Sequence, residues 1–577
     1  MKTLQTFVLV TLLAALPIAV AAEDGDVTPN TTEGSIEFGG LFSDVDGSPV
    51  MAAEYLTVEE GPVGKFTLDT NQDWGALDLK FKYVAQDQNA GDLNFDIKRM
   101  VRSHNTYTKM PHRLGHDPMT YLESTSRNGK VVEHTDQSPN QDYVMNYAVF
   151  EDRTELQFPG FRPLTLAFEF REQVRNGHTQ AFTTSHCDTC HIKSQAHQRD
   201  QQTTDGTLEA AVAWKSGVVR ARYTNRQLRE STPSVTQTYD KNLHPELQVP
   251  VFDNRMQYDS DAGVVPVDLK PEINKDTTRL DFRWASKNGF AVTANGVWAE
   301  TENRGTGNTA DYSGYVVTAA KRFGNHFRLR WNGKVYQTET NDVYIDTIER
   351  VTPAGPHAGQ TYFDVYGKNY DHTRYSALNR DGLKSRLDGS YRFGRKLGTL
   401  RAVWDYEVID RDYYEVAPGE KKTTSNILGV SYRMRPAKGL RLDAEFKHGD
   451  VTNAFMAVDA TCSTLVSPRY TNPWSPETPQ YDDQHETRIG DTTATASSWN
   501  KAVLALGYTF GQSTLTGRYV YWDGDNSDGD LTEWSKNRQT ATVTFWSPGG
   551  SSWDWYVGWA YQDMSLDAPT CVPVFDG

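Results

Sequence analysis

The chain has 577 residues, a formal net charge of -16 and a mean hydropathy of -0.64, yet 12 % of its residues are aromatic. The negative charge argues against a nucleic-acid partner, and beyond the N-terminus no segment approaches the ~20 consecutive apolar residues that a transmembrane helix needs. A polar average with many aromatic residues and 44 glycines is typical of membrane β-barrels, in which only every second strand residue faces lipid.

The first element in chain order is a secretory signal peptide at residues 1–22. Lys2 supplies a positive charge, an apolar stretch follows, and Ala19-Val20-Ala21 forms a small-residue cleavage site. A retained membrane anchor is the weaker interpretation, because the apolar run is short and ends at that cleavage site. We therefore expect a mature chain of residues 23–577. No Pro/Ser-rich linker, helical heptad or charge block divides this stretch, so we expect one domain.

Apolar and polar residues alternate with a period of two through the mature chain. In segments 77–83, 279–284, 440–447, 504–510 and 540–545, one face is apolar and the other is charged, polar or small. This pattern indicates half-buried β-strands rather than helices. A soluble β-sandwich also alternates, but roughly 20 such strands are far more than a sandwich contains.

The connections between these strands are short and long in turn. Short turns occur at 215–217, 287–289, 323–325, 394–396, 435–438 and 547–550. Long polar loops are expected near 103–143, 183–207, 225–276, 301–312, 337–381, 410–423, 449–499 and 523–537. The asymmetry predicts an all-β fold, a large antiparallel transmembrane β-barrel of roughly 20 or more strands, with short periplasmic turns and long external loops. The expected location is the bacterial outer membrane, and the expected lumen is polar and either water-filled or plugged.

The end of the chain departs from this rhythm. The last predicted strand ends near Tyr561 and runs outward, so Cys571 to Gly577 would lie on the outer side with no returning strand. Because barrels of this kind have an even number of strands, we expect the chain to be C-terminally incomplete. A miscount near residues 41–62 is the alternative.

One motif carries chemistry. Cys187-Asp188-Thr189-Cys190-His191 matches C-x-x-C-H, the attachment signature of c-type haem, in which two thiols bind the haem vinyl groups and the histidine ligates iron. We predict one haem, with His197 or His178 as the second axial ligand. Since the 183–207 loop has no Met, ligation by two histidines is favoured over His/Met.

Other interpretations of these cysteines stay open. A zinc ion could be held by Cys187, Cys190, His191 and one of His178, His186 or His197, although the second ligand pair lacks the usual separation. A simple disulfide or redox thiol pair is the other alternative. The remaining cysteines, Cys462 and Cys571, fall in loops on the same predicted side and are candidates for a disulfide in an oxidising compartment.

A family resemblance adds to these observations. The opening Gly34-Ser35-Ile36-Glu37-Phe38-Gly39-Gly40, followed by Tyr55 and Gly64-Lys65-Phe66 and a long train of hairpins, resembles the MtrB/PioB-type outer-membrane β-barrels of porin–cytochrome extracellular electron-transfer conduits. The resemblance implies a barrel that sheathes a periplasmic multihaem c-type cytochrome inserted in its lumen and that meets an extracellular multihaem cytochrome. This chain departs from the pattern because its C-x-x-C lies deep in the sequence and is followed by His191.

A single haem cannot carry electrons across an apolar band of ~25 Å, so the motif alone does not make a conduit. The expected function is an electron-transfer component of the outer membrane, and not an enzyme. A diffusion porin or solute channel with structural or redox-active cysteines is the alternative. A haem reductase is a further one, and it would need an open iron position. No hydrolytic or nucleotide-binding motif is present.

Overall fold

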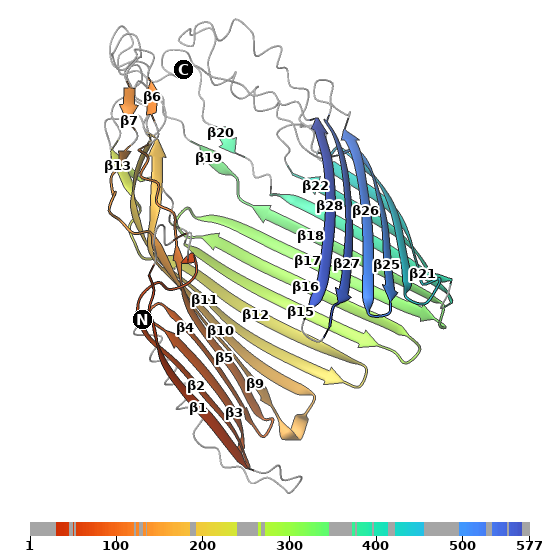
Figure 1. The fold of residues 1–577 in the computed structure, drawn as a ribbon, viewed down its shortest axis with the longest axis horizontal. Coiled ribbons are helices and arrows are strands. Elements are labelled where there is room, and N and C mark those ends of the chain that lie inside the picture. Colours follow the sequence, from red (N-terminus) through yellow and green to blue (C-terminus); the bar gives the residue numbers. More distant parts are fainter. Residues whose placement is uncertain are drawn as a thin grey trace, which may run out of the picture.

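The computed structural model is all-β, and its strands form one long curved sheet (Figure 1). It describes residues 30–44, 50, 53–120, 123–125, 131–133, 135–184, 192–238, 264–266, 270, 272–345, 372–374, 378–394, 397–412, 422–454, 496–526, 534–550 and 553–567. A 3-10 turn, η1, covers Pro159–Phe161. Among the described residues, no helix is long and apolar enough to cross a membrane.

The first half of the main sheet contains β1 Thr31–Leu41, β2 Gly61–Gln72, β3 Gly75–Val84, β4 Gln88–Ile97, β5 Val101–Arg113, β8 Thr135–Asp136, β9 Val144–Gln157, β10 Leu164–Thr184, β11 Ile192–Trp214, β12 Gly217–Glu230 and β15 Ile273–Ala285. The second half contains β16 Phe290–Asn303, β17 Asn308–Phe323, β18 Phe327–Thr340, β21 Arg380–Gly394, β22 Gly398–Arg411, β23 Lys422–Met434, β24 Leu440–Thr452, β25 Ser498–Phe510, β26 Ser513–Asn526, β27 Trp534–Pro548 and β28 Asp554–Asp567. Three small ribbons pair β6 Glu123–Thr125 with β7 Val131–Glu133, β13 Thr236–Thr238 with β14 Val264–Pro266, and β19 Val343–Ile345 with β20 His372–Arg374.

The main sheet has 22 strands, in agreement with the predicted class and size. Each long strand pairs antiparallel with the next long strand along the chain, and only the two-residue β8 departs, pairing parallel with β11. Within the described residues, β1 pairs with β2 alone and β28 with β27 alone, so these strands are the two edges of the sheet.

The two ends of the sheet differ as the sequence predicts. Short connections such as 215–216, 286–289, 324–326 and 435–439 lie at one end. Two further short connections, 85–87 and 304–307, lie at the other end, so the long loop expected near 301–312 is wrong and is a turn of four residues. The strand ends that flank the long connections, including 114–143, 231–272, 341–379 and 453–497, also lie at the other end. These ends are called the short-turn end and the long-loop end below.

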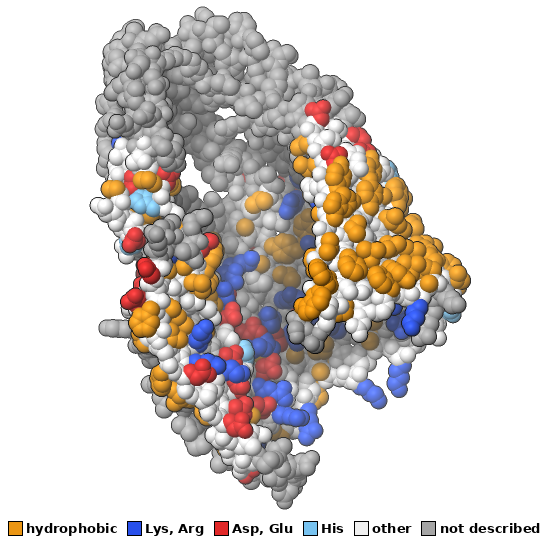
Figure 2. All heavy atoms as spheres, in the orientation of Figure 1, with side chains coloured by type: hydrophobic (Ala, Val, Ile, Leu, Met, Phe, Trp, Pro, Cys, Tyr) orange, Lys and Arg blue, Asp and Glu red, His pale blue; other side chains and the backbone are white. Residues whose placement is uncertain are grey.

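The two faces of the sheet differ in polarity. One face exposes large apolar side chains at mid-strand, with Leu208, Leu428 and Trp559 each more than half exposed. Figure 2 shows this face as a band of hydrophobic side chains over β25 to β28, whereas Lys, Arg, Asp and Glu side chains gather in the hollow enclosed by the sheet. Apolar residues outside and charged residues inside are what a sheet in a bilayer requires, and the chain is an outer-membrane β-barrel protein.

The strands extend further toward the long-loop end than predicted. The loop expected at 183–207 is wrong in its extent, because β10 continues to Thr184 and β11 begins at Ile192. Similarly, β5 covers residues 101–113, and the loop expected at 225–276 is shortened by the end of β12 and the start of β15. Above the lipid belt, an outward face needs no apolar side chains, so polar strand residues there cannot be told from a loop by alternation.

Aromatic rings pack over glycines at several places in the sheet. A Cβ atom at Gly382 would lie 2.1 Å from the Tyr336 ring, and one at Gly449 would lie 2.4 Å from the Trp499 ring. Both glycines are therefore required by a neighbouring ring rather than by an unusual backbone conformation.

Candidate functional site

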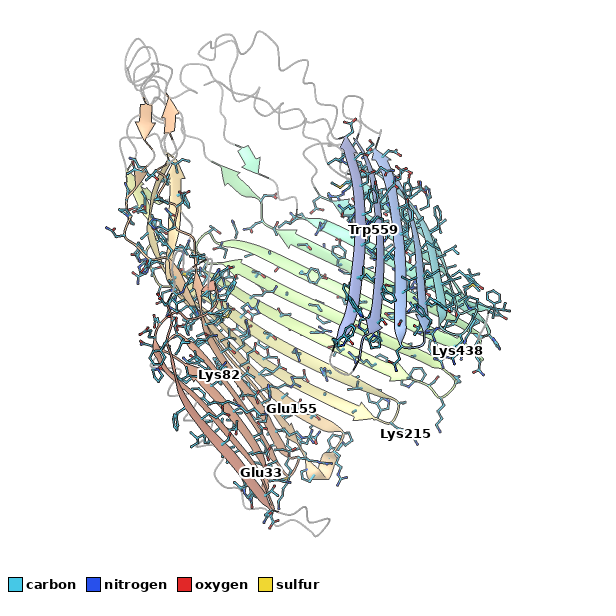
Figure 3. The ribbon with its side chains drawn as sticks, in the orientation of Figure 1. Glu33, Lys82, Glu155, Lys215, Lys438 and Trp559 are labelled. Carbon is cyan, nitrogen blue, oxygen red and sulfur yellow. The ribbon has the colours of Figure 1, made fainter. Side chains whose placement is uncertain are left out.

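The inner face of β9 to β12 is a wall of paired charges centred on Glu209. Its side chain is almost fully buried and accepts contacts from Arg222 at 2.7 Å, Arg220 at 3.1 Å and Arg153 at 3.3 Å. Arg153 also contacts Glu155 at 2.7 Å and pairs with Glu169 across the strands. Figure 3 labels Glu155 on this part of the sheet. A buried carboxylate is tolerated here because three guanidinium groups surround it.

The same pattern of pairing continues toward the long-loop end of the wall. Asp205 accepts two hydrogen bonds from Arg226, at 2.6 and 2.8 Å, in the two-pronged geometry that favours Arg over Lys. Arg171 lies 3.7 Å from Asp205 and 3.0 Å from Glu151. We call the ion-paired groups of β9 to β12 the balanced wall, because its arginines and carboxylates neutralise one another. Arg175 on β10 is not part of it, since it lies over the Tyr147 ring at 5.2 Å.

On the opposite part of the sheet, β21 to β24 carry similar inward ion pairs. These are Lys384–Glu407 at 2.8 Å, Arg386–Asp405 at 3.2 Å, Arg441–Asp443 at 2.6 Å, Arg401–Asp388 and Arg433–Asp443.

Between these two regions, the inner face is basic. The inward charged residues of β17 and β18 are Arg322, Arg328, Arg330 and Lys334, and the acidic residues of these strands point outward. We call these four residues the basic stripe. None of the four has a carboxylate within 4.0 Å among the described residues, and the three arginines are exposed.

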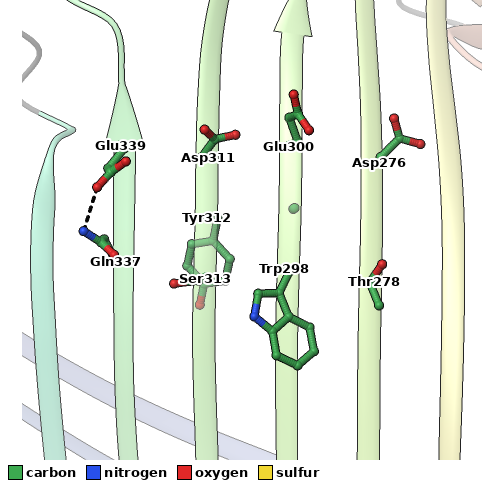
Figure 4. A pocket seen from close by; sticks show the side chains of 10 residues that line it. Asp276, Thr278, Trp298, Glu300, Asp311, Tyr312, Ser313, Gln337 and Glu339 are labelled. Atoms are coloured by element: carbon green, nitrogen blue, oxygen red, sulfur yellow. Dashed lines mark hydrogen bonds between the residues drawn. The ribbon is translucent and has the colours of Figure 1, made fainter.

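The outward face at the long-loop end carries a row of four carboxylates. Asp276, Glu300, Asp311 and Glu339 are in register across β15 to β18 and line a groove of about 400 Å³ with Trp298 (Figure 4). The Gln337 amide donates to Glu339 at 2.7 Å. Carboxylates directly opposite one another repel, so this row does not stabilise the sheet, and the pairing of the strands keeps the four side chains together. Among the described residues, no group of three His, Cys, Asp or Glu side chains is arranged to hold a metal ion.

A polar clamp holds the 114–143 connection against the long hairpin β10–β11. Asp136, with a side chain 3 % exposed, accepts hydrogen bonds from Ser194 Oγ at 3.0 Å and from the Ser138 N–H at 3.0 Å. His116 Nε2 lies 2.6 Å from the same carboxylate. Burial opposes ionisation of Asp136, but these hydrogen bonds outweigh it and lower its pKa below the ordinary value of 3.8. Gln180 adds a second tie by exchanging hydrogen bonds with the backbone of Asp117 at 2.7 and 2.9 Å.

The cysteines of the predicted site lie outside the described residues. Cys187, Cys190 and His191, and also His186, fall in the 185–191 connection between β10 and β11, and Cys462 and Cys571 are likewise outside. The last described pair before the motif is Thr184 with Ile192, so the motif occupies the connection at the long-loop end of the hairpin.

The two histidines predicted as a second ligand lie on opposite faces of that hairpin. His197 is opposite Thr179 and only 2 % exposed, whereas His178 is opposite Gln198 and half-buried. Side chains of adjacent cross-strand pairs point to opposite faces, so one haem could use one of them but not both.

Sequence reasoning missed the basic stripe, the carboxylate row and the clamp. The alternation Arg328, Leu329, Arg330, Trp331 was visible in the sequence as a strand with a basic inner face. That no described carboxylate lies within 4.0 Å of these arginines was not visible, because the β18–β21 register spans the 341–379 connection. The clamp had no signal, since Asp136 and Ser194 are 58 residues apart.

Comparison with known proteins gives structural similarity only. No family model matches the chain, and no curated protein sequence does. The structure of the FpvAI–pyocin S2 complex aligns with a TM-score of 0.41 and 10 % identity over 92 % of this chain, which spans 65 % of that chain. The RagAB peptide transporter aligns with a TM-score of 0.42 and 10 % identity, covering 87 % of this chain and 71 % of that one. The ferric-catecholate import receptor Fiu from Escherichia coli K12 gives a TM-score of 0.38 and 10 % identity, covering 90 % and 76 %.

Proposed function

We propose that this chain is the barrel sheath of a porin–cytochrome complex that supports electron transfer across the outer membrane. The observation that carries the proposal is the balanced wall. A lining in which Glu209 and Asp205 already neutralise their arginines is hydrophilic but leaves few free charges. Such a lining can contact the surface of a folded, water-soluble protein without burying unpaired charges. The proposed occupant is a periplasmic multihaem c-type cytochrome, and an extracellular multihaem cytochrome is the proposed acceptor.

The Cys187-Asp188-Thr189-Cys190-His191 motif extends the proposal with one c-type haem on the barrel itself. Haem would supply one-electron transfer chemistry at the outer mouth. Cys187 and Cys190 would hold it covalently and His191 would ligate iron, with His197 or His178 as the second ligand. The clamp supports this assignment, because it fixes the hairpin below the motif through Ser194 and Gln180.

Haem attachment is tested on the purified chain. A pyridine haemochrome assay and a peroxidase stain after denaturing electrophoresis should show one covalent haem, lost in Cys187→Ser and Cys190→Ser. The matched control is Cys462→Ser, which removes a cysteine outside the motif and should keep the haem. A chain without covalent haem, or a Cys462→Ser variant that loses it equally, would contradict the assignment.

The sheath role is tested separately by isolation from outer membranes in mild detergent. Mass spectrometry and haem staining should show a multihaem cytochrome in constant ratio to the barrel. Recovery of the barrel alone would count against the sheath.

A diffusion porin is the second candidate, and the charged hollow in Figure 2 favours it because such a lining also suits water and ions. Planar-bilayer conductance separates the two, since a sheath should conduct poorly with its occupant and a porin should conduct well as isolated.

A further inference from the structure

The charges of the basic stripe oppose one another across the strands. Arg322 on β17 is directly opposite Arg328 on β18, and Lys334 on β18 is directly opposite Lys384 on β21. Like charges facing each other on one side of a sheet destabilise it. On the balanced wall, by contrast, Arg222 and Arg226 each meet a carboxylate within 3 Å.

The surroundings of the stripe do not neutralise it. The neighbours of Arg330 in register are Ala320 and Asp388, and the ion pair of Asp388 is with Arg401. Lys334 lies with its ammonium 4.4 Å from the centre of the Tyr336 ring, a cation–π contact that leaves its charge intact.

The position of the stripe shows from which side it can be reached. Arg322 and Arg328 flank the 324–326 turn, so the stripe begins at the short-turn end and runs inward along β18. The tips of other turns at this end are also basic, because Lys215, Lys287 and Lys438 are all exposed. Figure 3 labels Lys215 and Lys438 there. The connections 215–216, 286–289, 324–326 and 435–439 contain no acidic residue.

We propose that the basic stripe is the docking surface for an acidic protein segment that enters the lumen from the short-turn, periplasmic end. Charge complementarity assigns the occupant, because three exposed guanidinium groups with no described carboxylate within 4.0 Å are matched by closely spaced Asp or Glu side chains. The stripe faces the lumen and not the lipid side, which disfavours lipid phosphates as the ligand. The assignment of this segment to the cytochrome rests on the function proposed above.

The test uses the full-length chain in detergent micelles and a fluorescein-labelled poly-L-glutamate peptide, followed by fluorescence anisotropy. The test variant combines Arg322→Gln, Arg328→Gln and Arg330→Gln. The matched control combines Lys215→Gln, Lys287→Gln and Lys438→Gln, which removes the same charge from the turn tips at the same end. Far-UV circular dichroism and unfolding in urea establish that both variants are folded.

The stripe should bind the acidic peptide but not a poly-lysine peptide of the same length. We expect the arginine variant to weaken binding about tenfold and the lysine variant to change it less than about twofold, as for several exposed ionic contacts. Binding should also be lost in about 1 M salt, where the Debye length falls to roughly 3 Å.

Three results would overturn the proposal. An equal loss of peptide affinity in the two variants would mean that the positive charge of the whole short-turn end, and not the stripe, attracts the peptide. No binding by the folded wild type would remove the docking surface. Displacement of the peptide by inorganic phosphate at equal charge concentration would make the stripe a site for small anions. Because no cytochrome is present in this assay, its outcome is independent of the sheath role. The stripe can bind the peptide even if the barrel holds no cytochrome, and the barrel can hold a cytochrome even if the stripe does not bind the peptide.

Discussion

The balanced wall and the basic stripe are two parts of one inner face. Charged side chains of the wall have oppositely charged neighbours, whereas most of those of the stripe face like charges. On the balanced wall, Glu209 collects three arginines and Asp205 is shared between Arg226 and Arg171. On the basic stripe, Arg322 faces Arg328, and no described carboxylate lies within 4.0 Å of either. The first arrangement stabilises the sheet, whereas the second stores repulsion that a partner can relieve.

This difference separates a structural use of lumen charge from a binding use. A sheath needs a hydrophilic lining along most of its length, and paired charges provide one without attracting counter-ions. Recognition of a partner needs charge that is left free, at a place the partner can reach, and the stripe begins at the short-turn end. The comparison predicts large stability effects from variants of the wall and small ones from variants of the stripe.

Glu209→Gln should have the largest effect. Removing this carboxylate leaves Arg153, Arg220 and Arg222 around a neutral side chain, and breaking a buried ion pair on one side typically destabilises by about 3 kcal/mol. The measurement is the free energy of unfolding in urea from detergent micelles. Glu339→Gln is the control, because Glu339 is exposed on the outward face, and removing its repulsion with Asp311 should change stability by only about 0.2–1 kcal/mol. Equal changes in the free energy of unfolding would show that Glu209 stabilises the fold no more than an exposed carboxylate does.

Gly382→Ala should destabilise by about 1–3 kcal/mol, because the new methyl group would overlap the Tyr336 ring that lies beside Lys334. Gly517→Ala is the matched control in another strand, where the nearest atom is 4.0 Å away. Both are measured by the same urea titration. If the two substitutions have equal effects, the ring above Gly382 does not constrain the sheet.

Asp136→Asn should release the 114–143 connection from the β10–β11 hairpin at a cost of about 1–3 kcal/mol, as for hydrogen bonds to a charged group. In the wild type, the folded-state pKa of Asp136 is lowered, so its contribution is fully present above about pH 3.8 and is lost as the pH falls through the lower folded value. Hydrogen exchange of residues 114–120 and 135–143 at pH 7 and at pH 3 measures this release. Protection that is the same at both pH values in wild type and variant would contradict the role of the carboxylate.

Arg328→Gln should have the smallest effect and the opposite sign. It removes the repulsion with Arg322 and should raise the free energy of unfolding by about 0.2–1 kcal/mol at low ionic strength. The gain should shrink as salt is added, because the charges are exposed. A loss of stability comparable to that of Glu209→Gln would mean that Arg328 has a structural partner.

The membrane-spanning part of each strand was predictable, and the parts above it were not. Within the lipid belt, residues such as Leu442, Ala444 and Phe446 must be apolar on one face, so alternation marks the strand. In the extended hairpin of β10 and β11, both faces of residues 192–203 are polar, and the sequence resembles a loop. This strand is defined by backbone hydrogen bonds to its neighbouring strands, and the alternation of apolar and polar residues in the sequence does not reveal those bonds.

For the candidate site, the sequence predicted which chemical group could bind but not which lumen charges are paired. The spacing of Cys187, Cys190 and His191 predicts haem attachment from local sequence alone. Which charges of the lumen are paired depends on the register between strands, and Asp388 illustrates this. It is opposite Arg330 in register, yet its ion pair is with Arg401 on the other neighbouring strand.

Electron transfer across a sealed membrane tests the central proposal most directly. The barrel, isolated in mild detergent with whatever remains bound, is reconstituted in liposomes that enclose a redox dye, and a membrane-impermeant reductant is added outside. The account predicts rapid reduction of the enclosed dye, while a small impermeant fluorophore in the same liposomes stays inside. Two results together would contradict the account: the fluorophore leaks out freely, and the dye stays oxidised when the reductant cannot enter the liposomes. They would identify the barrel as an open channel.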